Sequence, residues 1–277
     1  LDHIFGGEQF QTKERSRSSL WWRTDFRWDQ LQGYTFRNSF RASIWLPHLA
    51  NRWHLVIAGE NRGDPTAAVP VDPGNPGTDV GSKVRAGSAE LVYDLFRTRQ
   101  AIVSLGAGVQ LKIWPDAFSR VRFGYVQPLG SDTLVWLLAT AYWKAIDGPG
   151  ESNQVIFERQ LTPVALLRWS NSLTIEEGSN GWNWGTEPTL GYVLSPKSAL
   201  TVGVSARGPT RPSWEAQNYR VYAGYRRNIL RSWLFCEVEP DINWPLNEDR
   251  KREPVWGITF RFELLFAGKE TAYPATR

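Results

Sequence analysis

Three carboxylates stand at alternate positions in the C-terminal part of the chain: Glu237, Glu239 and Asp241. Residues two apart on a strand point to the same face, so these acids could supply the pair of carboxyls, about 5 to 10 Å apart, that glycoside hydrolysis requires. The basic residues at matching positions of the flanking segments are Arg220, Arg226 and Arg261. Opposite charges on one face of neighbouring strands stabilise a sheet, which favours structural ion pairing over catalysis.

Other groups that could do chemistry are few. The histidines are His3, His48 and His54, and none lies in an HExxH motif or beside a GxSxG motif. Cys236 is the single cysteine, so no internal disulfide and no CxxC metal motif can form. We therefore expect no catalytic residue, no metal site and no cofactor, and we expect that the protein is not an enzyme.

The segments that carry these charges alternate with period two, the pattern of a strand with one apolar and one polar face. In the last one, the apolar side holds Trp256, Ile258, Phe260, Phe262, Leu264 and Phe266, and the other side holds Gly257, Thr259, Arg261 and Glu263. The predicted strands are 19–28, 34–46, 53–61, 84–96, 101–113, 119–127, 134–145, 153–160, 164–175, 182–194, 199–207, 218–226, 233–244 and 255–266. Most have the length that a tilted strand needs to cross a bilayer.

Composition indicates where the apolar face lies. Aromatic residues make up 13% of the 277 residues, with 15 Trp, while charged residues make up 22%. Aromatic side chains gather at membrane boundaries, and only a closed sheet leaves no unpaired edge in lipid. We therefore predict an all-β fold, a membrane-spanning antiparallel up-and-down β-barrel of about 14 strands. Soluble packing of the Trp residues or sugar binding is the less favoured alternative. The predicted aromatic girdle is Trp22, Trp28, Trp45, Trp53, Trp136, Trp143, Trp244 and Trp256.

The polar face of such a barrel must line its lumen. The predicted lumen-lining charged residues are Arg37, Arg41, Arg120, Arg122, Arg220, Arg226, Glu237, Glu239, Asp241, Arg261 and Glu263. Rings of charge select ions only where one sign prevails locally, so this mixture forms either a salt-bridged plug or a weakly selective pore. The prevalence of Arg, which pairs with carboxylates in bidentate geometry, favours a constricted lumen.

The predicted organisation is a periplasmic N-terminal extension over 1–17, a transmembrane barrel over 18–266 and a periplasmic C-terminal tail over 267–277. Connections alternate between short turns and longer polar segments, among them 61–83 and 147–152, which is typical of periplasmic turns and outer loops. An even strand number places both termini in the periplasm. The chain starts without Met or a signal peptide, so we expect a processed, exported protein of a Gram-negative outer membrane.

Several motifs resemble those of a family of uncharacterised proteobacterial outer-membrane β-barrel proteins. They are Arg168-Trp169-Ser170-Asn171-Ser172, Arg207-Gly208-Pro209-Thr210-Arg211-Pro212, Tyr219-Arg220-Val221 to Tyr225-Arg226-Arg227-Asn228, Glu237-Val238-Glu239-Pro240, Asn243-Trp244-Pro245 and Thr259-Phe260-Arg261-Phe262-Glu263-Leu264-Leu265-Phe266. The resemblance covers roughly residues 15–266. It implies the barrel fold and no activity, and it implies that Phe266 is the terminal aromatic residue that insertion machinery reads, although eleven residues follow it.

Two main hypotheses of function remain open. The first is a porin-like transport channel for small polar solutes. The second is a membrane-anchoring barrel subunit of an export or envelope-spanning complex, with a periplasmic or surface protein as partner. An outer-leaflet enzyme is the least favoured. Outer-membrane lipids are expected partners, and nucleic acid is not, because the 32 basic residues are dispersed along the chain.

Overall fold

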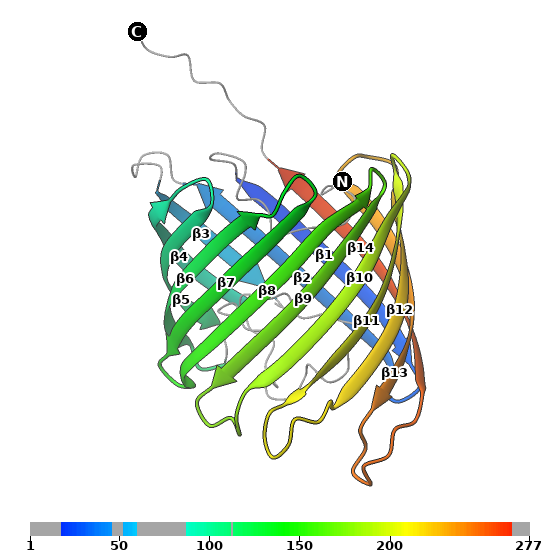
Figure 1. The fold of residues 1–277 in the computed structure, drawn as a ribbon. Coiled ribbons are helices and arrows are strands. Elements are labelled where there is room, and N and C mark those ends of the chain that lie inside the picture. The colour runs from blue at the N-terminus through cyan, green and yellow to red at the C-terminus, as the bar shows by residue number, and fades with distance from the viewer. Residues whose placement is uncertain (1–17, 46–51, 60–86, 112, 268–277) are drawn as a thin grey trace.

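The computed structural model describes residues 18–45, 52–59, 87–111 and 113–267, and these form one closed β-barrel (Figure 1). The fourteen strands are β1 (Ser19–Asp29), β2 (Gly33–Trp45), β3 (Trp53–Gly59), β4 (Gly87–Arg97), β5 (Ala101–Leu111), β6 (Asp116–Pro128), β7 (Thr133–Lys144), β8 (Gly148–Thr162), β9 (Ala165–Glu176), β10 (Asn183–Ser195), β11 (Ser198–Pro209), β12 (Asn218–Asn228), β13 (Leu234–Pro245) and β14 (Val255–Ala267). Each pairs antiparallel with its neighbours in sequence. The predicted fold class is confirmed.

The barrel closes between the first and last strands. The β1–β14 register runs from Ser19 opposite Ala267 to Asp29 opposite Gly257. Both ends of the barrel segment therefore lie at the same rim, the upper one in Figure 1. The predicted extension over 1–17 and nearly all of the predicted tail, 268–277, lie outside the described residues.

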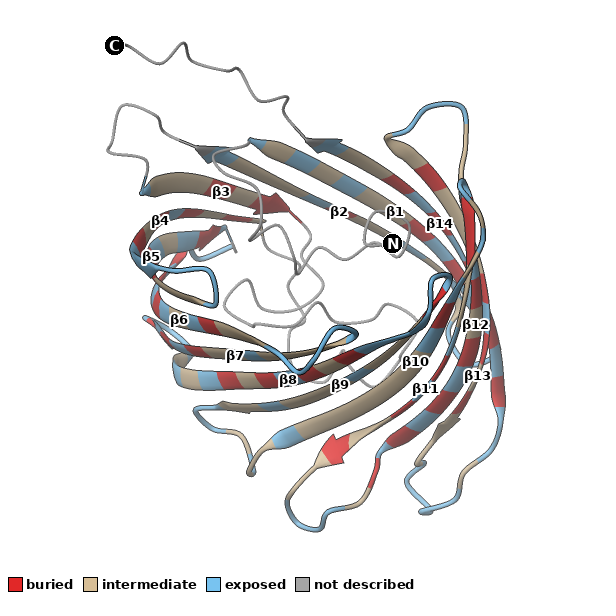
Figure 2. Cartoon of the chain, turned by 45° about the horizontal axis from the view of Figure 1, so that its top comes forward, coloured by how far each residue is buried: buried red, intermediate tan, exposed pale blue. Residues whose placement is uncertain are grey.

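Side chains alternate between an inward and an outward face, as a pleated strand requires. On β12, Arg220 and Tyr222 are buried, whereas Tyr219, Val221 and Tyr225 are exposed. Figure 2 shows buried positions alternating with exposed ones along β12 and mostly with intermediate ones along β13. The barrel is inverted relative to a water-soluble protein, because its exposed outer surface is apolar and aromatic while its buried residues are mostly polar or charged.

Two strands begin three or more residues earlier than predicted. The segment 147–152, predicted as a loop, mostly belongs to β8, which starts at Gly148. The glycines that suggest a loop have other uses here: Gly148 has a φ of +78° at the turn, and a Cβ on Gly150 would collide with the ring of Tyr142. Because β8 starts at Gly148, the connection from β7 to β8 is a short turn. Similarly, β6 begins at Asp116, three residues before the predicted start.

Connections at the two rims differ in length. At the rim that carries Ser19 and Ala267, the described turns are short, for example between Thr162 and Ala165 and between Ser195 and Ser198. At the opposite rim, longer loops join Pro209 to Asn218 and Pro245 to Val255. No helix in the described part of the chain is long and apolar enough to span a membrane.

Candidate functional site: the charged inner wall

One sector of the inner face carries acids and arginines in roughly equal number. We call it the paired wall, and it consists of Arg23, Asp25, Arg27, Asp29, Arg220, Arg226, Glu237, Glu239, Asp241, Arg261 and Glu263. These side chains project from β12, β13, β14 and β1, which are consecutive around the barrel. The alternate spacing on each strand brings them to one face, so the sequence spacing of two becomes a two-dimensional network of opposite charges.

Arg220 is at the centre of one half of this network, which contains Glu239, Asp241 and Arg27. It is 1% exposed, and its guanidinium lies 2.7 Å from Glu239 and 3.4 Å from Asp241. Arg27 of β1 reaches Asp241 from the other side with two bonds, at 2.6 and 3.1 Å. The amide of Asn243 also donates to Asp241, at 2.6 Å. Asp241 is thus fully satisfied by three partners, which is the arrangement that makes a buried charge tolerable.

The second half of the paired wall centres on Arg226 and Arg261. Arg226 binds Glu263 in bidentate geometry, with bonds of 2.9 and 3.0 Å, and its guanidinium lies 4.5 Å from the ring centre of Phe235. Arg261 forms ion pairs with Glu237 and, at 3.0 Å, with Asp25. The predicted pairing of the three carboxylates of β13 with Arg220, Arg226 and Arg261 is therefore present.

The sector made by β2 to β6 is different. We define the arginine wall as Arg41, Arg120 and Arg122, together with Glu90. Arg120 forms an ion pair with Glu90, both buried. The pair spans β5, where Gly106 lies between them; a Cβ on Gly106 would collide with the Glu90 carboxylate. The absence of a side chain on Gly106 is what lets the two charges meet.

Arg122 and Arg41 have no ion-pair partner among the described residues, in contrast to every arginine of the paired wall. The Nε of Arg122 is buried and finds no acceptor in the described part of the chain. Of the charges in the described part of the chain, Arg120 and Arg41 repel Arg122 and Glu90 attracts it. Counted over those residues, the arginine wall carries excess positive charge.

The neighbouring charges of Arg37 and Asp94 leave this excess of positive charge in place. Arg37 of β2 stands opposite Asp25 of β1 in the strand register, so it borders the paired wall. Asp94 of β4 is bound by Arg97 at 2.7 Å. In the described residues no group of three or more His, Cys, Asp and Glu side chains is arranged to hold a metal ion.

The rest of the inner face, on β7 to β11, is mainly neutral and polar. The buried residues Thr140, Ser152 and Gln154 are examples. Several of its charges are paired, as in the contact of 2.6 Å between Arg168 and Glu158. The ion-pair network therefore covers only part of the inner face. The neutral polar sector leaves groups that can form hydrogen bonds with a polar solute.

The Trp residues of the predicted girdle divide between the two faces. Trp22, Trp28, Trp143 and Trp256 point outward and are 39% to 54% exposed. Trp53 and Trp244 occupy outward positions in the strand alternation. The side chain of Trp45 lies outside the described residues.

Trp136 differs from the prediction. It shares the inward face of β7 with Thr140 and Tyr142, and its indole N–H donates to Glu158 at 3.1 Å. The prediction relied on its position near a strand end, but the face of the strand decides which side of the barrel a residue meets.

Two inward acids, Asp29 and Asp116, escaped the sequence reasoning because both lie just outside the predicted strands. Asp29 is 2% exposed and accepts a bond of 3.2 Å from Arg27. Asp116 is 0% exposed and accepts the backbone N–H of Ile146 at 3.0 Å. The inward positions continue from Arg120 back through Phe118 to Asp116, but the apolar Phe118 points inward there and the polar Ser119 outward, so the polarity pattern of the sequence breaks before Asp116.

Comparison with known proteins identifies the architecture. No protein-family model and no curated protein sequence matches the chain. The structure is similar to that of the outer membrane channel DcaP of Acinetobacter baumannii, with a TM-score of 0.53 and 8% identity over 90% of this chain and 96% of that one. It is also similar to the CymD monoaromatic hydrocarbon channel, with a TM-score of 0.53 and 8% identity over 97% of this chain and 93% of that one. At these identities the comparisons establish a shared barrel fold, and the proteobacterial family suggested by the motifs stays a prediction.

Proposed function

We propose that this protein is a porin-like channel of a bacterial outer membrane that passes small polar solutes through a charged lumen. The observation that carries the proposal is the inversion of the barrel: across fourteen paired strands the buried face is polar and charged while the exposed face is apolar and aromatic. Hydrocarbon around the outer face and water inside would satisfy both surfaces.

The structural neighbours support this proposal at the level of fold, since two barrels of similar architecture are described as channels. The strand number supports it as well. Eight strands enclose an interior filled by side chains and sixteen to eighteen leave an aqueous channel, so a barrel of fourteen has room for a lumen. A channel needs no catalytic group, in keeping with the expectation that the protein is not an enzyme.

Orientation is part of the proposal. The rim that carries Ser19 and Ala267 has the shorter described turns, and we assign it to the periplasm, with the loops 210–217 and 246–254 outside the cell. The anchoring-subunit hypothesis and its periplasmic or surface partner stay predictions.

The test is ion conductance of the purified protein in a planar bilayer. We expect discrete conductance steps in KCl that scale with salt concentration. Heat-denatured protein, added at the same concentration, is the control for detergent leaks. A folded barrel that inserts into the bilayer and gives no conductance above this control would contradict the channel function and leave the membrane-anchoring hypothesis as the better one.

A further inference from the structure

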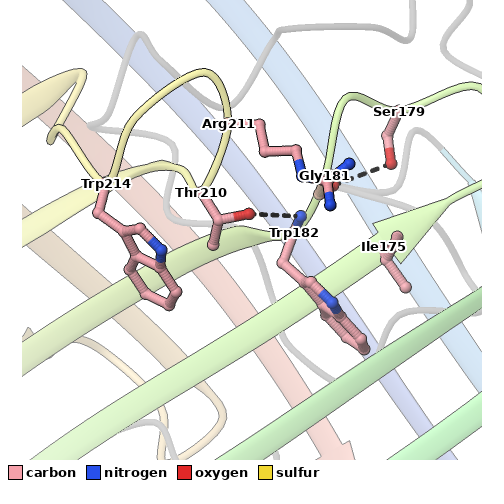
Figure 3. Close-up of a pocket in the computed structure, with 7 residues that line it drawn as sticks. All are labelled: Ile175, Ser179, Gly181, Trp182, Thr210, Arg211 and Trp214. Atoms are coloured by element: carbon pink, nitrogen blue, oxygen red, sulfur yellow. Dashed lines mark hydrogen bonds between the residues drawn. The ribbon is translucent and has the colours of Figure 1, made fainter.

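A cavity lies at the rim opposite Ser19, away from the charged inner wall. It has a volume of about 350 Å³ and is lined by Ile175, Ser179, Gly181, Trp182, Thr210, Arg211 and Trp214 (Figure 3). These residues come from the end of β9, the β9–β10 loop and the β11–β12 loop. Two loops that are about thirty residues apart in the chain therefore build one site.

Hydrogen bonds join the two loops. The backbone N–H of Thr210 donates to the carbonyl of Trp182 at 2.7 Å, and the backbone N–H of Trp182 donates to the Thr210 hydroxyl oxygen at 2.9 Å. Gly181 has a φ of +95°, and a Cβ there would lie 2.7 Å from Thr210 Oγ1. A residue with a side chain would force the loops apart, so glycine keeps the cavity formed.

The cavity opens on the outer surface of the barrel. Ile175 shares the outward face of β9 with Trp169 and Leu173, which are 49% and 39% exposed. In Figure 3 the rings of Trp182 and Trp214 lie on the same side of the ribbon as Ile175. Trp214 is 72% exposed. Trp at the end of a membrane strand is typical of the boundary where lipid headgroups begin.

The charge of the cavity is positive. Arg211 is exposed and has no ion-pair partner among the described residues. No carboxylate lines the cavity, and Glu215, on the same loop as Arg211, is engaged by Arg250 at 2.6 Å. The guanidinium fork matches the oxygens of a phosphate, and the hydroxyl of Thr210 can add a further donor.

We propose that this cavity, made by Trp182, Thr210, Arg211 and Trp214, binds the phosphate of an anionic lipid headgroup at the membrane boundary. Arg211 binds the phosphate, the two indoles pack against the rest of the headgroup and the upper acyl region, and the acyl chains lie along the outward face of β9. The inference rests on the membrane location in the proposed function, but not on an open lumen.

The experiment is native mass spectrometry of the protein in a zwitterionic detergent, titrated with phosphatidylglycerol and, separately, with phosphatidylcholine. We expect one phosphatidylglycerol to bind preferentially, and Arg211→Gln to weaken that binding about fivefold, since one basic residue near a lipid surface contributes roughly that much. Trp214→Ala should weaken it as well. Arg231→Gln, which removes an exposed arginine from the loop between β12 and β13 at the opposite rim, is the matched control and should bind like the wild type.

Equal binding of phosphatidylglycerol by the wild type and the Arg211→Gln variant would overturn the proposal, as would equal binding of the two lipids. Competition by glycerol phosphate at the same concentration would assign the cavity to a soluble phosphate and reject the lipid. Heat-dependent migration on gels confirms that each variant still forms the barrel. A protein that binds the lipid but conducts no ions would keep this inference and reject the channel, so the two failures are distinguishable.

Discussion

The paired wall and the arginine wall are neighbouring sectors of one barrel, which meet where β1 pairs with β2, and they use the same side chain differently. In the paired wall each arginine meets at least one carboxylate, and Arg220 is held between two. In the arginine wall only Arg120 has a described acid, while Arg41 and Arg122 have none. A buried charge is tolerated when it is compensated, so the paired wall is explained by the stability of the sheet. The arginine wall has no such compensation for Arg41 and Arg122 among the described residues, so we expect these two side chains to attract anions.

The largest expected effect is on stability. Replacing Arg220 by Leu leaves Glu239 and Asp241 short of a cation in a buried network, and removing one partner of a buried pair costs about 3 to 5 kcal/mol. Replacing Arg122 by Leu removes no described ion pair and should cost less than about 1 kcal/mol. Urea unfolding of both variants in lipid vesicles measures the difference. Equal losses would show that the two walls do not differ in the way the structure indicates.

An intermediate effect is expected at Gly106, which makes room for the single ion pair of the arginine wall. A methyl group in the Gly106→Ala variant displaces the Glu90 carboxylate from Arg120, and we expect a loss of about 1 to 3 kcal/mol from the unsatisfied charge. Gly87→Ala is the control, because its Cβ would meet atoms no closer than 3.4 Å. The same unfolding assay compares them; a neutral Gly106→Ala variant would contradict the role assigned to this glycine.

The smallest expected effect is on ion selectivity, after the loss of a single positive charge from the inner face. Arg122→Gln and Arg168→Gln each remove one positive charge from the inner face, but Arg168 is paired with Glu158 at 2.6 Å. We expect a wild-type preference for chloride over potassium that Arg122→Gln reduces by about half or more, because an unpaired charge sets local selectivity. Arg168→Gln exposes an acid and should change the zero-current potential in the same direction but by less. A larger change for Arg168→Gln would place the selective charge outside the arginine wall.

The fold was largely predictable from the sequence because one physical constraint repeats fourteen times. A strand between hydrocarbon and water must alternate, so even β5, with few charges, shows its two faces in Val109 and Leu111 against Gly108 and Gln110. The predicted loop over 147–152 was wrong because glycine suits two structures. It is common in loops, yet Gly150 is a strand residue whose missing side chain accommodates the ring of Tyr142.

The site was less predictable than the fold. Alternation places Arg122 and Arg220 on the inward face alike, but it says nothing of which acid each one meets. That depends on the register between strands and on small residues such as Gly106 that let side chains cross a strand. The rim cavity depends on hydrogen bonds between the loops of Trp182 and Thr210, and no short-range pattern encodes that contact.

The measurement that tests the central claim most directly is the water accessibility of adjacent positions on one strand. Cys236 is the only native cysteine, so Ser172→Cys and Leu173→Cys can be compared in a Cys236→Ser background in lipid vesicles. Ser172 faces inward and Leu173 outward on β9. A charged, water-soluble thiol reagent should label the cysteine at 172 and leave the one at 173 unreacted. Labelling at 173 with protection at 172 would contradict a wet interior surrounded by lipid.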